Sequence, residues 1–423
     1  MLTNTLEKPI NQTNNSKKVN VAIGGSNINQ ELESMVPLVD RSVGISHSEF
    51  TQRIKNLMSL LDENCIDAIY LDTSSNLTYF TGLKLVASER LHGAILTCHG
   101  DIAYICPAFE KEKTEAMISM AGPILTWEEH ENPTQIVMKA LSVLGIKRGC
   151  IAIDENTPLF LFDALLEANK GHKLVNGCSV TKKCRQIKSI VEISLIKASM
   201  EIALEVQKAT ARILYEGITT TEVQDFITEA HRRLGSHTPP AFNIVLFGEA
   251  TAYPHGVPYV QKLSRGDTVL IDIGATVGGY YSDLTRTYVF GKPSKRQREI
   301  WELEQMAQNA VFRAAKLGVT CENLDFVARE VLESRGFGPG YKTPGLPHRT
   351  GHGLGLDIHE HPYIVRGNTE ILQEGMCFSN EPMICLYREF GVRLEDHIYM
   401  TPDGPSWFTQ PAKSIEDPFD DLT

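Results

Sequence analysis

The sequence has no excess of basic charge and no long apolar run. Its 423 residues carry 41 lysines and arginines against 52 aspartates and glutamates, which gives a net charge of −11. This balance offers no electrostatic footprint for nucleic acid or for an anionic membrane surface. No stretch of 18 apolar residues is present, and the N-terminus lacks the charged-then-apolar order of a signal peptide. We therefore expect a cytoplasmic protein that binds neither nucleic acid nor a membrane.

Paired cysteine motifs are also absent. None of the nine cysteines forms a C-x-x-C pair, and most lie in apolar segments such as IAYIC at residues 102–106. Such surroundings are typical of reduced cysteines that are buried and behave as small hydrophobic residues. This usage agrees with a cytoplasmic location.

The chain is long enough for two or three domains. Residues 1–45 are rich in Asn, Thr, Ser and Lys and have few large apolar side chains, which predicts an arm that is flexible or ordered only by a partner subunit. Ser46 and Glu49 fit a capping box, after which short β-runs alternate with helical stretches. This alternation predicts an N-terminal α/β domain over residues 46–184.

A second domain is predicted over residues 185–423, beginning with one long amphipathic helix at about 185–215. The segment 217–235 then begins and ends with glycine and holds a helical pattern between them. The same order recurs at 318–336 after another long helix. We interpret this as an internal repeat of one supersecondary unit. The alternative is that two unrelated helix hairpins have glycine and threonine at their helix ends, because these residues are common there.

A short span at residues 345–362, GLPHRTGHGLGLDIHEHP, concentrates histidine and glycine. Its four histidines are His348, His352, His359 and His361. The alternating glycines let the backbone bend closely around a ligand while the imidazoles converge on it. A glycine-rich surface loop that happens to contain histidine is the alternative.

Four acidic residues of the second domain stand in apolar, strand-like surroundings. They are Asp272 in VLIDIGA, Asp283 in YYSDLTRTY, Glu381 in CFSNEPMI and Glu395 in GVRLEDHIYM. Ionised carboxylates within apolar runs are costly unless they are paired or bind a metal. Each half of the repeat supplies two, so a pseudo-two-fold arrangement would bring all four to a shared centre, where His352 would join them.

This set of side chains predicts a dinuclear metal site. Four carboxylates and one histidine exceed what one ion needs, and carboxylates can bridge two ions. We expect two divalent metal ions per chain, Mn²⁺ first, with Co²⁺, Zn²⁺ or Fe²⁺ as alternatives. A water between two such ions loses a proton near neutral pH and becomes a nucleophile. Hydrolysis is therefore the expected reaction.

Five motifs can be compared with known families: Pro254-His255-Gly256, LIDIGATVGGYYSDLTRT, HRTGHGLGLDIHEHP, Asn380-Glu381-Pro382 and Val392-Arg393-Leu394-Glu395-Asp396. Together they resemble the pita-bread metallopeptidase family, in particular its proline-specific branch of Xaa-Pro dipeptidase (prolidase) and aminopeptidase P. The resemblance begins near residue 46 and includes SSNLTYFTG in the first domain. It implies an α/β (α+β) fold, in which a creatinase-like α/β domain precedes a pita-bread domain with a pseudo-two-fold repeat. It also implies a homodimer.

The resemblance implies roles for particular positions. The implied metal ligands are Asp272, Asp283, His352, Glu381 and Glu395. Of these, Asp283 and Glu395 would bridge the ions, and Glu381 would also carry the proton.

It implies further roles in catalysis and substrate binding. His255 and His359 would bind the scissile carbonyl and the tetrahedral intermediate. Arg393 would orient the site, and His348 would face the proline end of the substrate. No role carries over to His361, for which we expect a structural function.

The implied activity is hydrolysis of the bond before proline in a dipeptide or short peptide. One alternative is a lyase of the same fold that acts on a small substrate such as dimethylsulfoniopropionate. The family resemblance implies that this lyase branch has an extra acidic ligand near the first aspartate. In this sequence, the neighbours of Asp272 are apolar residues or glycine. A second alternative is a non-catalytic peptide-binding module, which the complete ligand set disfavours.

Overall fold

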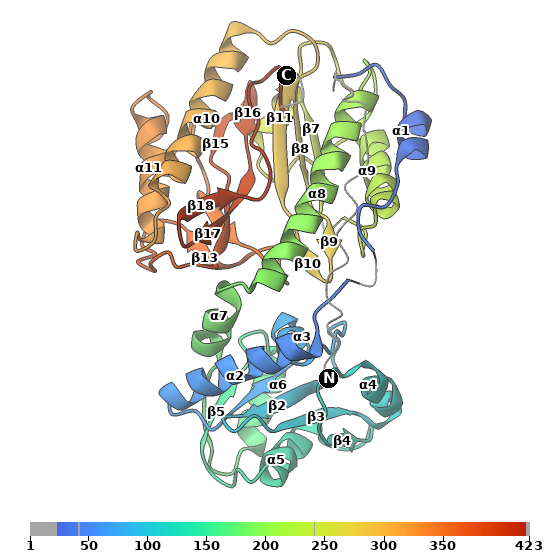
Figure 1. Cartoon of the computed structure of the whole chain (residues 1–423), viewed down its shortest axis with the longest axis vertical. Helices are drawn as coiled ribbons and strands as arrows, with labels where there is room; N and C mark the ends of the chain where they lie inside the picture. The colour runs from blue at the N-terminus through green and yellow to red at the C-terminus, as the bar shows by residue number, and fades with distance from the viewer. Residues whose placement is uncertain (1–22, 41–42, 241, 420–423) are drawn as a thin grey trace, which may run out of the picture.

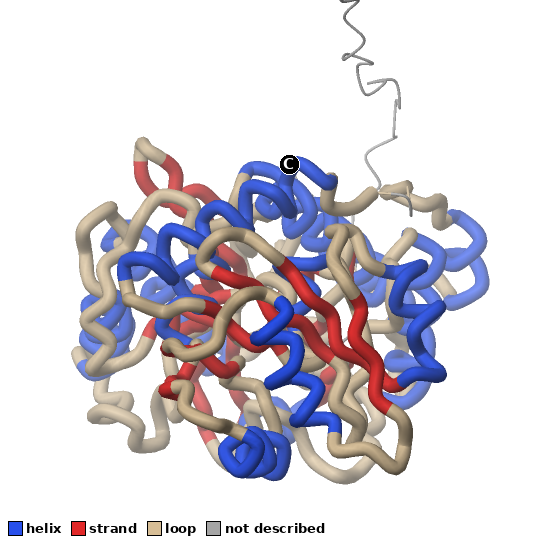
Figure 2. The backbone as a smooth tube through the Cα atoms, turned by 90° about the horizontal axis from the view of Figure 1, so that it is seen from below, coloured by secondary structure: helices blue, strands red, loops and turns tan. Residues whose placement is uncertain are grey.

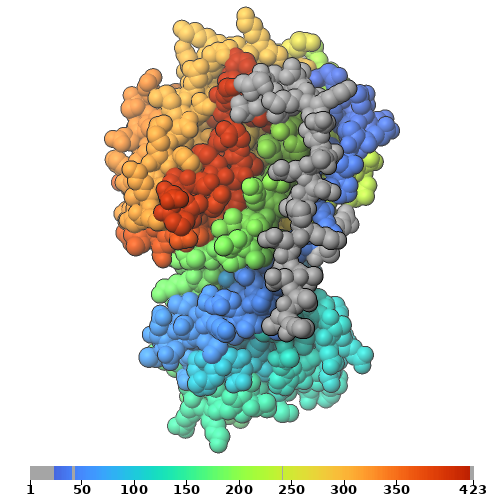
Figure 3. All heavy atoms as spheres, in the orientation of Figure 1, coloured from blue at the N-terminus to red at the C-terminus, as the bar shows by residue number. Residues whose placement is uncertain are grey.

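The computed structural model describes residues 23–40, 43–240 and 242–419 (Figure 1). The chain forms two lobes placed end to end, and the surface narrows where they meet (Figure 3). Helices α7 (Cys178–Gln186) and α8 (Ile190–Ile213) run through this junction.

A six-stranded sheet forms the centre of the first lobe, in the order β4-β3-β2-β1-β5-β6. The strands are β1 (Ala68–Leu71), β2 (Gly93–Thr97), β3 (Ile102–Pro107), β4 (Ile124–Trp127), β5 (Cys150–Ile153) and β6 (Lys173–Asn176). The helices are α2 (His47–Glu63), α3 (Ser75–Thr81), the 3-10 turn η1 (Ala108–Glu110), α4 (Lys111–Met117), α5 (Pro133–Val143) and α6 (Leu159–Ala168). Helices lie on both faces of the strands (Figure 2). The predicted α/β architecture is confirmed.

Strand β1 shows why this segment is apolar throughout. Ile69 and Leu71 enter the core shared with α2 and α3, whereas Ala68 and Tyr70 enter the core shared with α5 and α6. Successive side chains of a strand point to opposite faces, so a sheet covered on both faces needs apolar residues at every position.

Two helix pairs enclose the strands of the second lobe (Figure 1). The helices are α8, α9 (Thr220–Leu234), α10 (Lys295–Ala314) and α11 (Cys321–Glu333), and a 3-10 turn, η2, spans Gly248–Ala252. The first-half strands are β7 (Asn243–Phe247), β8 (Thr268–Ile273), β9 (Thr276–Val277), β10 (Tyr280–Tyr281) and β11 (Leu284–Val289). The second-half strands are β12 (Gly351–Gly353), β13 (Glu360–Ile364), β14 (Cys377–Asn380), β15 (Met383–Leu386), β16 (Phe390–Arg393), β17 (Asp396–Thr401) and β18 (Gly404–Trp407).

The two halves of this lobe repeat the order of helix pair followed by antiparallel strand pair. Strands β8 and β11 pair in the first half, and β14 and β17 pair in the second. Gly235 ends α9 in the left-handed region at φ 99°, and Gly336 adopts φ 85° after α11. Glycine adopts this conformation without the Cβ penalty of other residues. The left-handed backbone conformation therefore explains why glycine stands at the predicted ends of these two helices.

The long helix predicted over about 185–215 is α8, which begins at Ile190, and residues 185 and 186 form the end of α7. Ser189 caps α8: its Oγ accepts from the N–H of Glu192, and the Glu192 carboxylate accepts from the N–H of Ser189. This reciprocal capping starts a new helix.

Part of the arm predicted at residues 1–45 is ordered by its own chain, which corrects that prediction for the described residues. Helix α1 (Ile28–Ser34) lies beside α8 and α9 (Figure 1), and Ile28 and Leu32 pack against their core. The Glu31 carboxylate accepts two hydrogen bonds from the Arg212 guanidinium, at 2.7 and 3.0 Å. Residues 1–22 lie outside the described part of the chain.

Among the described residues, no helix combines the length and the apolar character that a membrane span requires.

Candidate metal centre

The four predicted carboxylates lie at equivalent ends of strands in the two halves. Asp272 is in β8, and Asp283 comes directly before β11. Asn380 opposes Asp396 in the β14–β17 pair, and Met383 opposes Arg393 in the β15–β16 pair. Glu381 and Glu395 therefore face each other in the gap between these two ladders. Pro382, which has no N–H to donate, is the residue at which pairing is interrupted.

His352, on β12, completes the group. Its Nε2 lies 3.1 Å from Glu381 Oε1 and 3.6 Å from Asp283 Oδ2. Potential ligand atoms of His352, Glu381 and Glu395 lie within 4.8 Å of one another. All five predicted ligand positions line a single cavity of about 700 Å³.

The cavity concentrates buried carboxyl groups. Burial raises the pKa of Asp283 and of Glu395 well above the usual range, and the neighbouring carboxylates raise both further. Burial also opposes ionisation of Glu381, but the adjacent His352 imidazole holds the pKa of this carboxyl below its usual range. Such a concentration of carboxylates is unfavourable unless cations balance it.

Several carboxylate oxygens are available to bind a cation. Among the described residues, Asp272 Oδ1, Asp283 Oδ1 and Glu395 Oε1 are buried and have no hydrogen-bond partner. Buried acceptors are normally satisfied, so three such oxygens facing one cavity call for an explanation. Divalent cations bound by carboxylate and imidazole would satisfy them. The residues present therefore fit the expected metal ions.

The predicted catalytic residues line the same cavity. His255 and His359 are exposed in its wall, and the His359 ring lies 4.2 Å from the His352 ring in an edge-to-face arrangement. Burial, assisted by the neighbouring His352 imidazole, lowers the pKa of His359 to about 4. The His359 imidazole is therefore neutral near pH 7, with one ring nitrogen as donor and the other as acceptor.

Arg393 connects two parts of the site. Its Nη2 lies 2.5 Å from Asp272 Oδ2, and its Nη1 donates to the carbonyl of Pro254 at 3.1 Å. Because Pro254 directly precedes His255, this buried guanidinium fixes the loop that carries His255 relative to the Asp272 carboxylate.

The remaining two histidines of the glycine-rich span do not form the cavity wall, but burial lowers the pKa of His348, and this residue lies close enough to the site for the charges of Glu381 and Arg393 to act on that pKa as well. His348 and His361 are not among the described residues that line the cavity. Nδ1 of His348 lies 2.7 Å from the carbonyl oxygen of Arg349. The ring of His361 packs against Tyr363 at 4.7 Å.

The glycines of this span permit close backbone contacts. A Cβ on Gly351 would lie 2.0 Å from the carbonyl oxygen of Ser379, so β12 and β14 could not approach as they do. The approach lets Ser379 Oγ accept from the N–H of His352 at 2.8 Å and donate to Glu381 Oε1 at 3.0 Å. At this position glycine permits the close packing of two strands, and the predicted bend of the backbone around a ligand stays a prediction.

Other residues of the site were not predicted from the sequence. His397 is fully buried, and its ring lies close to Asp283 and Glu395, with potential ligand atoms within 4.8 Å. Burial and the neighbouring His352 imidazole lower the pKa of His397 to about 3. Residues two apart share a face of a strand, so the spacing from Glu395 could have identified it.

The other lining residues that were not predicted are of two kinds: Tyr281, Asp357 and Ile358 lie within two residues of Asp283 or His359, whereas Asn156, Phe242 and Ile244 come from segments with no such signal. Asn156 follows β5 of the first lobe, so both lobes contribute to the cavity.

A buried ion pair supports the backbone of Glu395. Arg286 and Asp396 are both 0% exposed, and they meet at 2.7 Å. Arg286 Nη1 also donates to the carbonyl of Glu395 at 3.0 Å. Removing one partner of a buried pair leaves the other charge uncompensated, which is strongly destabilising.

We expect Arg286→Ala to lower the free energy of unfolding by about 3 to 5 kcal/mol, measured by chemical denaturation. Arg296→Ala is the matched control, because Arg296 and its partner Glu389 are both half exposed. Exposed pairs contribute about 0 to 1 kcal/mol. Equal effects of the two substitutions would contradict this prediction.

The two-lobed fold and this cavity define a class of metal-dependent hydrolases. Residues 194–402 match the model of metallopeptidase family M24, and residues 53–187 match the creatinase/prolidase N-terminal domain. A putative dipeptidase of Bacillus subtilis is 33% identical over 364 residues, covering 86% of this chain and 99% of the relative.

Solved structures show the same architecture. The Xaa-Pro dipeptidase of Bacillus anthracis is 28% identical with a TM-score of 0.75, covering 85% of this chain and 97% of that one. The X-Pro aminopeptidase of Thermotoga maritima is also 28% identical with a TM-score of 0.75, covering 85% of this chain and 98% of that one. The chain belongs to metallopeptidase family M24, and it is a metallopeptidase with the pita-bread fold.

Proposed function

We propose that this metallopeptidase hydrolyses the bond before proline in dipeptides or short peptides. The observation that carries the proposal is the single cavity lined by the five ligand positions and by His255, His359 and Arg393. Similar proteins named as a Xaa-Pro dipeptidase and an X-Pro aminopeptidase support the choice of bond.

The residues that would hold the metal ions are Asp272, Asp283, His352, Glu381 and Glu395, and Asp283 and Glu395 would serve both ions. Two divalent ions held there would activate a water for attack and polarise the scissile carbonyl. Mn²⁺ is the proposed metal, because oxygen-rich ligation suits it. We also propose that the protein acts in the cytoplasm as a homodimer.

The side chains of the cavity supply the remaining chemistry. Glu381 accepts the proton of the attacking water and delivers it to the leaving nitrogen. His255 and His359 donate hydrogen bonds to the carbonyl oxygen as negative charge develops on it. Arg393 holds Asp272 and the His255 loop in register. The role of His348 at the proline end rests on the family resemblance alone.

Comparing substrates tests this function. On protein loaded with Mn²⁺, we expect hydrolysis of Ala-Pro or Ala-Pro-Ala, with Ala-Ala cleaved about 10- to 200-fold less efficiently in kcat/KM, because one side-chain difference discriminates by that order. Chromatography of the products measures the rates. The ratio of Ala-Pro to Ala-Pro-Ala distinguishes a dipeptidase from an aminopeptidase. Consumption of dimethylsulfoniopropionate without peptide cleavage would contradict the proposal and indicate the lyase.

A further inference from the structure

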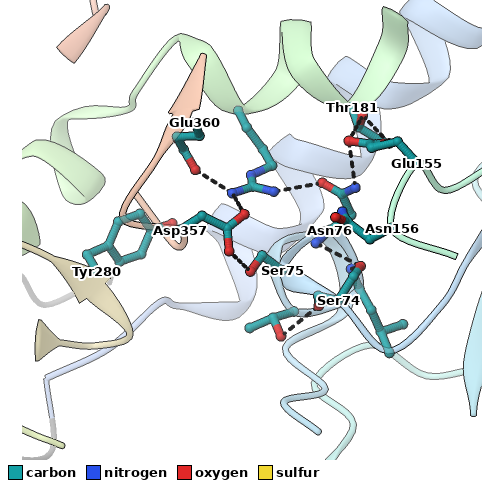
Figure 4. Close-up of polar contacts among 12 residues, drawn as sticks. Ser74, Ser75, Asn76, Glu155, Asn156, Thr181, Tyr280, Asp357 and Glu360 are labelled. Carbon is teal, nitrogen blue, oxygen red and sulfur yellow. Dashed lines mark hydrogen bonds and ion pairs between the residues drawn. The ribbon is translucent and has the colours of Figure 1, made fainter. Parts of the chain in front are cut away.

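A chain of polar contacts crosses the junction between the lobes and includes Asn76, Asp357 and Glu360 (Figure 4). Arg185 is at its centre. Arg185 stands in α7 and is 7% exposed. Its Nη1 donates to Asn76 Oδ1 of the first lobe at 2.9 Å. Its Nη2 donates to Asp357 Oδ2 of the second lobe at 2.7 Å and also contacts the Glu360 carboxylate. One planar guanidinium therefore joins the two lobes, with a separate nitrogen for each.

On the first-lobe side, the contacts lead to Asn156. Asn76 Nδ2 donates to Asp154 Oδ1 at 2.9 Å. The same oxygen accepts from the N–H of Asn156 at 3.0 Å and from its Nδ2 at 3.2 Å. Asn156 is exposed and lines the catalytic cavity. The bond to Asp154 uses the amide nitrogen, so the carboxamide oxygen is the atom that can accept from a ligand.

On the second-lobe side, the contacts fix the segment that carries His359. Glu360 directly follows His359, is 8% exposed and binds Lys188 Nζ at 2.5 Å. Asp357 lines the cavity, and its Oδ1 accepts from Ser75 Oγ at 2.5 Å. Both ends of the segment 357–360 are therefore anchored, one of them to α3 of the first lobe.

Close packing leaves this arrangement little freedom. A Cβ on Gly355 would lie 2.5 Å from Glu360 Oε1, so the carboxylate occupies the space that a side chain would take. A buried ion pair is weak evidence for stability, because apolar residues of similar volume in its place often give the fold equal or greater stability. Their directed bonds do fix geometry, and here the geometry relates two walls of the catalytic cavity.

We propose that Asn156 is a substrate-binding residue of the catalytic cavity and that Arg185 is the positioning residue that fixes Asn156 against the segment carrying His359. This inference rests on the proposed peptidase function. The Asn156 oxygen would accept a hydrogen bond from the ammonium group or an N–H of the peptide. The first lobe thus takes part in substrate recognition within the same chain.

Steady-state kinetics with Ala-Pro on metal-loaded protein test the proposal. We expect Asn156→Ala to raise KM about 10-fold to 100-fold with kcat nearly unchanged, the effect of losing one hydrogen bond to a charged group. Arg185→Lys keeps the charge but loses the planar fork, and should raise KM about 10-fold at unchanged metal content. Arg90→Lys is the control, because the ion pairs of Arg90 with Glu89 and Glu129 are exposed to solvent and Arg90 does not line the cavity.

A double-mutant cycle separates positioning from general support. If Arg185 acts through Asn156, Arg185→Lys adds little to KM in the Asn156→Ala background. The inference would be overturned if the KM increases of the two single variants multiply in the double variant, or if Asn156→Ala leaves KM unchanged. If the parent protein does not hydrolyse Ala-Pro, the proposed function fails instead. Calorimetric binding of Ala-Pro to the parent and to Asn156→Ala then decides the Asn156 assignment, and equal affinities reject it.

Discussion

Removing divalent metal is expected to abolish peptide hydrolysis and to leave most of the fold intact. The site loses its means of activating water and of balancing its buried carboxylates. The helices and strands keep their own apolar cores, which do not involve the metal ligands. Metal analysis after loading with Mn²⁺ or Co²⁺ should give close to two ions per chain. Circular dichroism before and after chelation measures the retained fold.

Readdition of metal provides the control. Activity should return when the second ion binds. Because the metal binds the native state and not the unfolded chain, it should also raise the melting temperature. Full hydrolysis in the presence of chelator, with a metal content near zero, would contradict both the ligand assignment and the proposed reaction.

The ligand positions were predictable because their surroundings are regular. Asp272 and Glu395 interrupt or border apolar strands, where a carboxylate is out of place unless it has a function. The strands then pair as expected, with Asp272 opposite Thr285 in the β8–β11 hairpin. Helix ends were also predictable, since Gly235 stands at the C-cap of α9. These features depend on local sequence alone.

Other features depended on competing signals. Ser189 and Glu192 form a readable capping box that begins α8 at Ile190, but the apolar periodicity on both sides of it predicted a helix that begins near residue 185. Ile28 and Leu32 have helical spacing, yet the polar composition around them predicted an arm. In each case a local motif was correct and the average over a longer window was wrong.

The contribution of the first lobe to the cavity could not be predicted from sequence. Asn156 follows a strand that pairs with β1, more than 100 residues before Asp272, and its loop carries no catalytic motif. Only tertiary packing places it beside the site. Arg185 and Glu360 likewise meet across 175 residues. Long-range polar contacts of this kind leave no periodic pattern in the chain.

Replacing Glu381 by alanine is expected to remove activity and at least part of the bound metal together. The Glu381 carboxylate lies 3.1 Å from His352 Nε2 and opposite Glu395, so it belongs to the ligand group and is also placed to move a proton. In contrast, His255→Ala and His359→Ala should retain near-normal metal content and lose about 10² to 10³ in kcat, the effect of removing one oxyanion donor. Metal analysis beside kcat, on the same preparations, measures both quantities.

The position of His359 makes this comparison decisive. Potential ligand atoms of His359, His352 and Asp283 lie within 4.8 Å of one another, so His359 could bind metal instead of substrate. A loss of metal in His359→Ala would assign it to the ligands and reject its role at the carbonyl. His361→Ala is the matched control, since His361 packs on Tyr363 outside the cavity and should keep the parent kcat. Parent-like turnover by His255→Ala would show that His255 is an exposed loop residue with no part in catalysis.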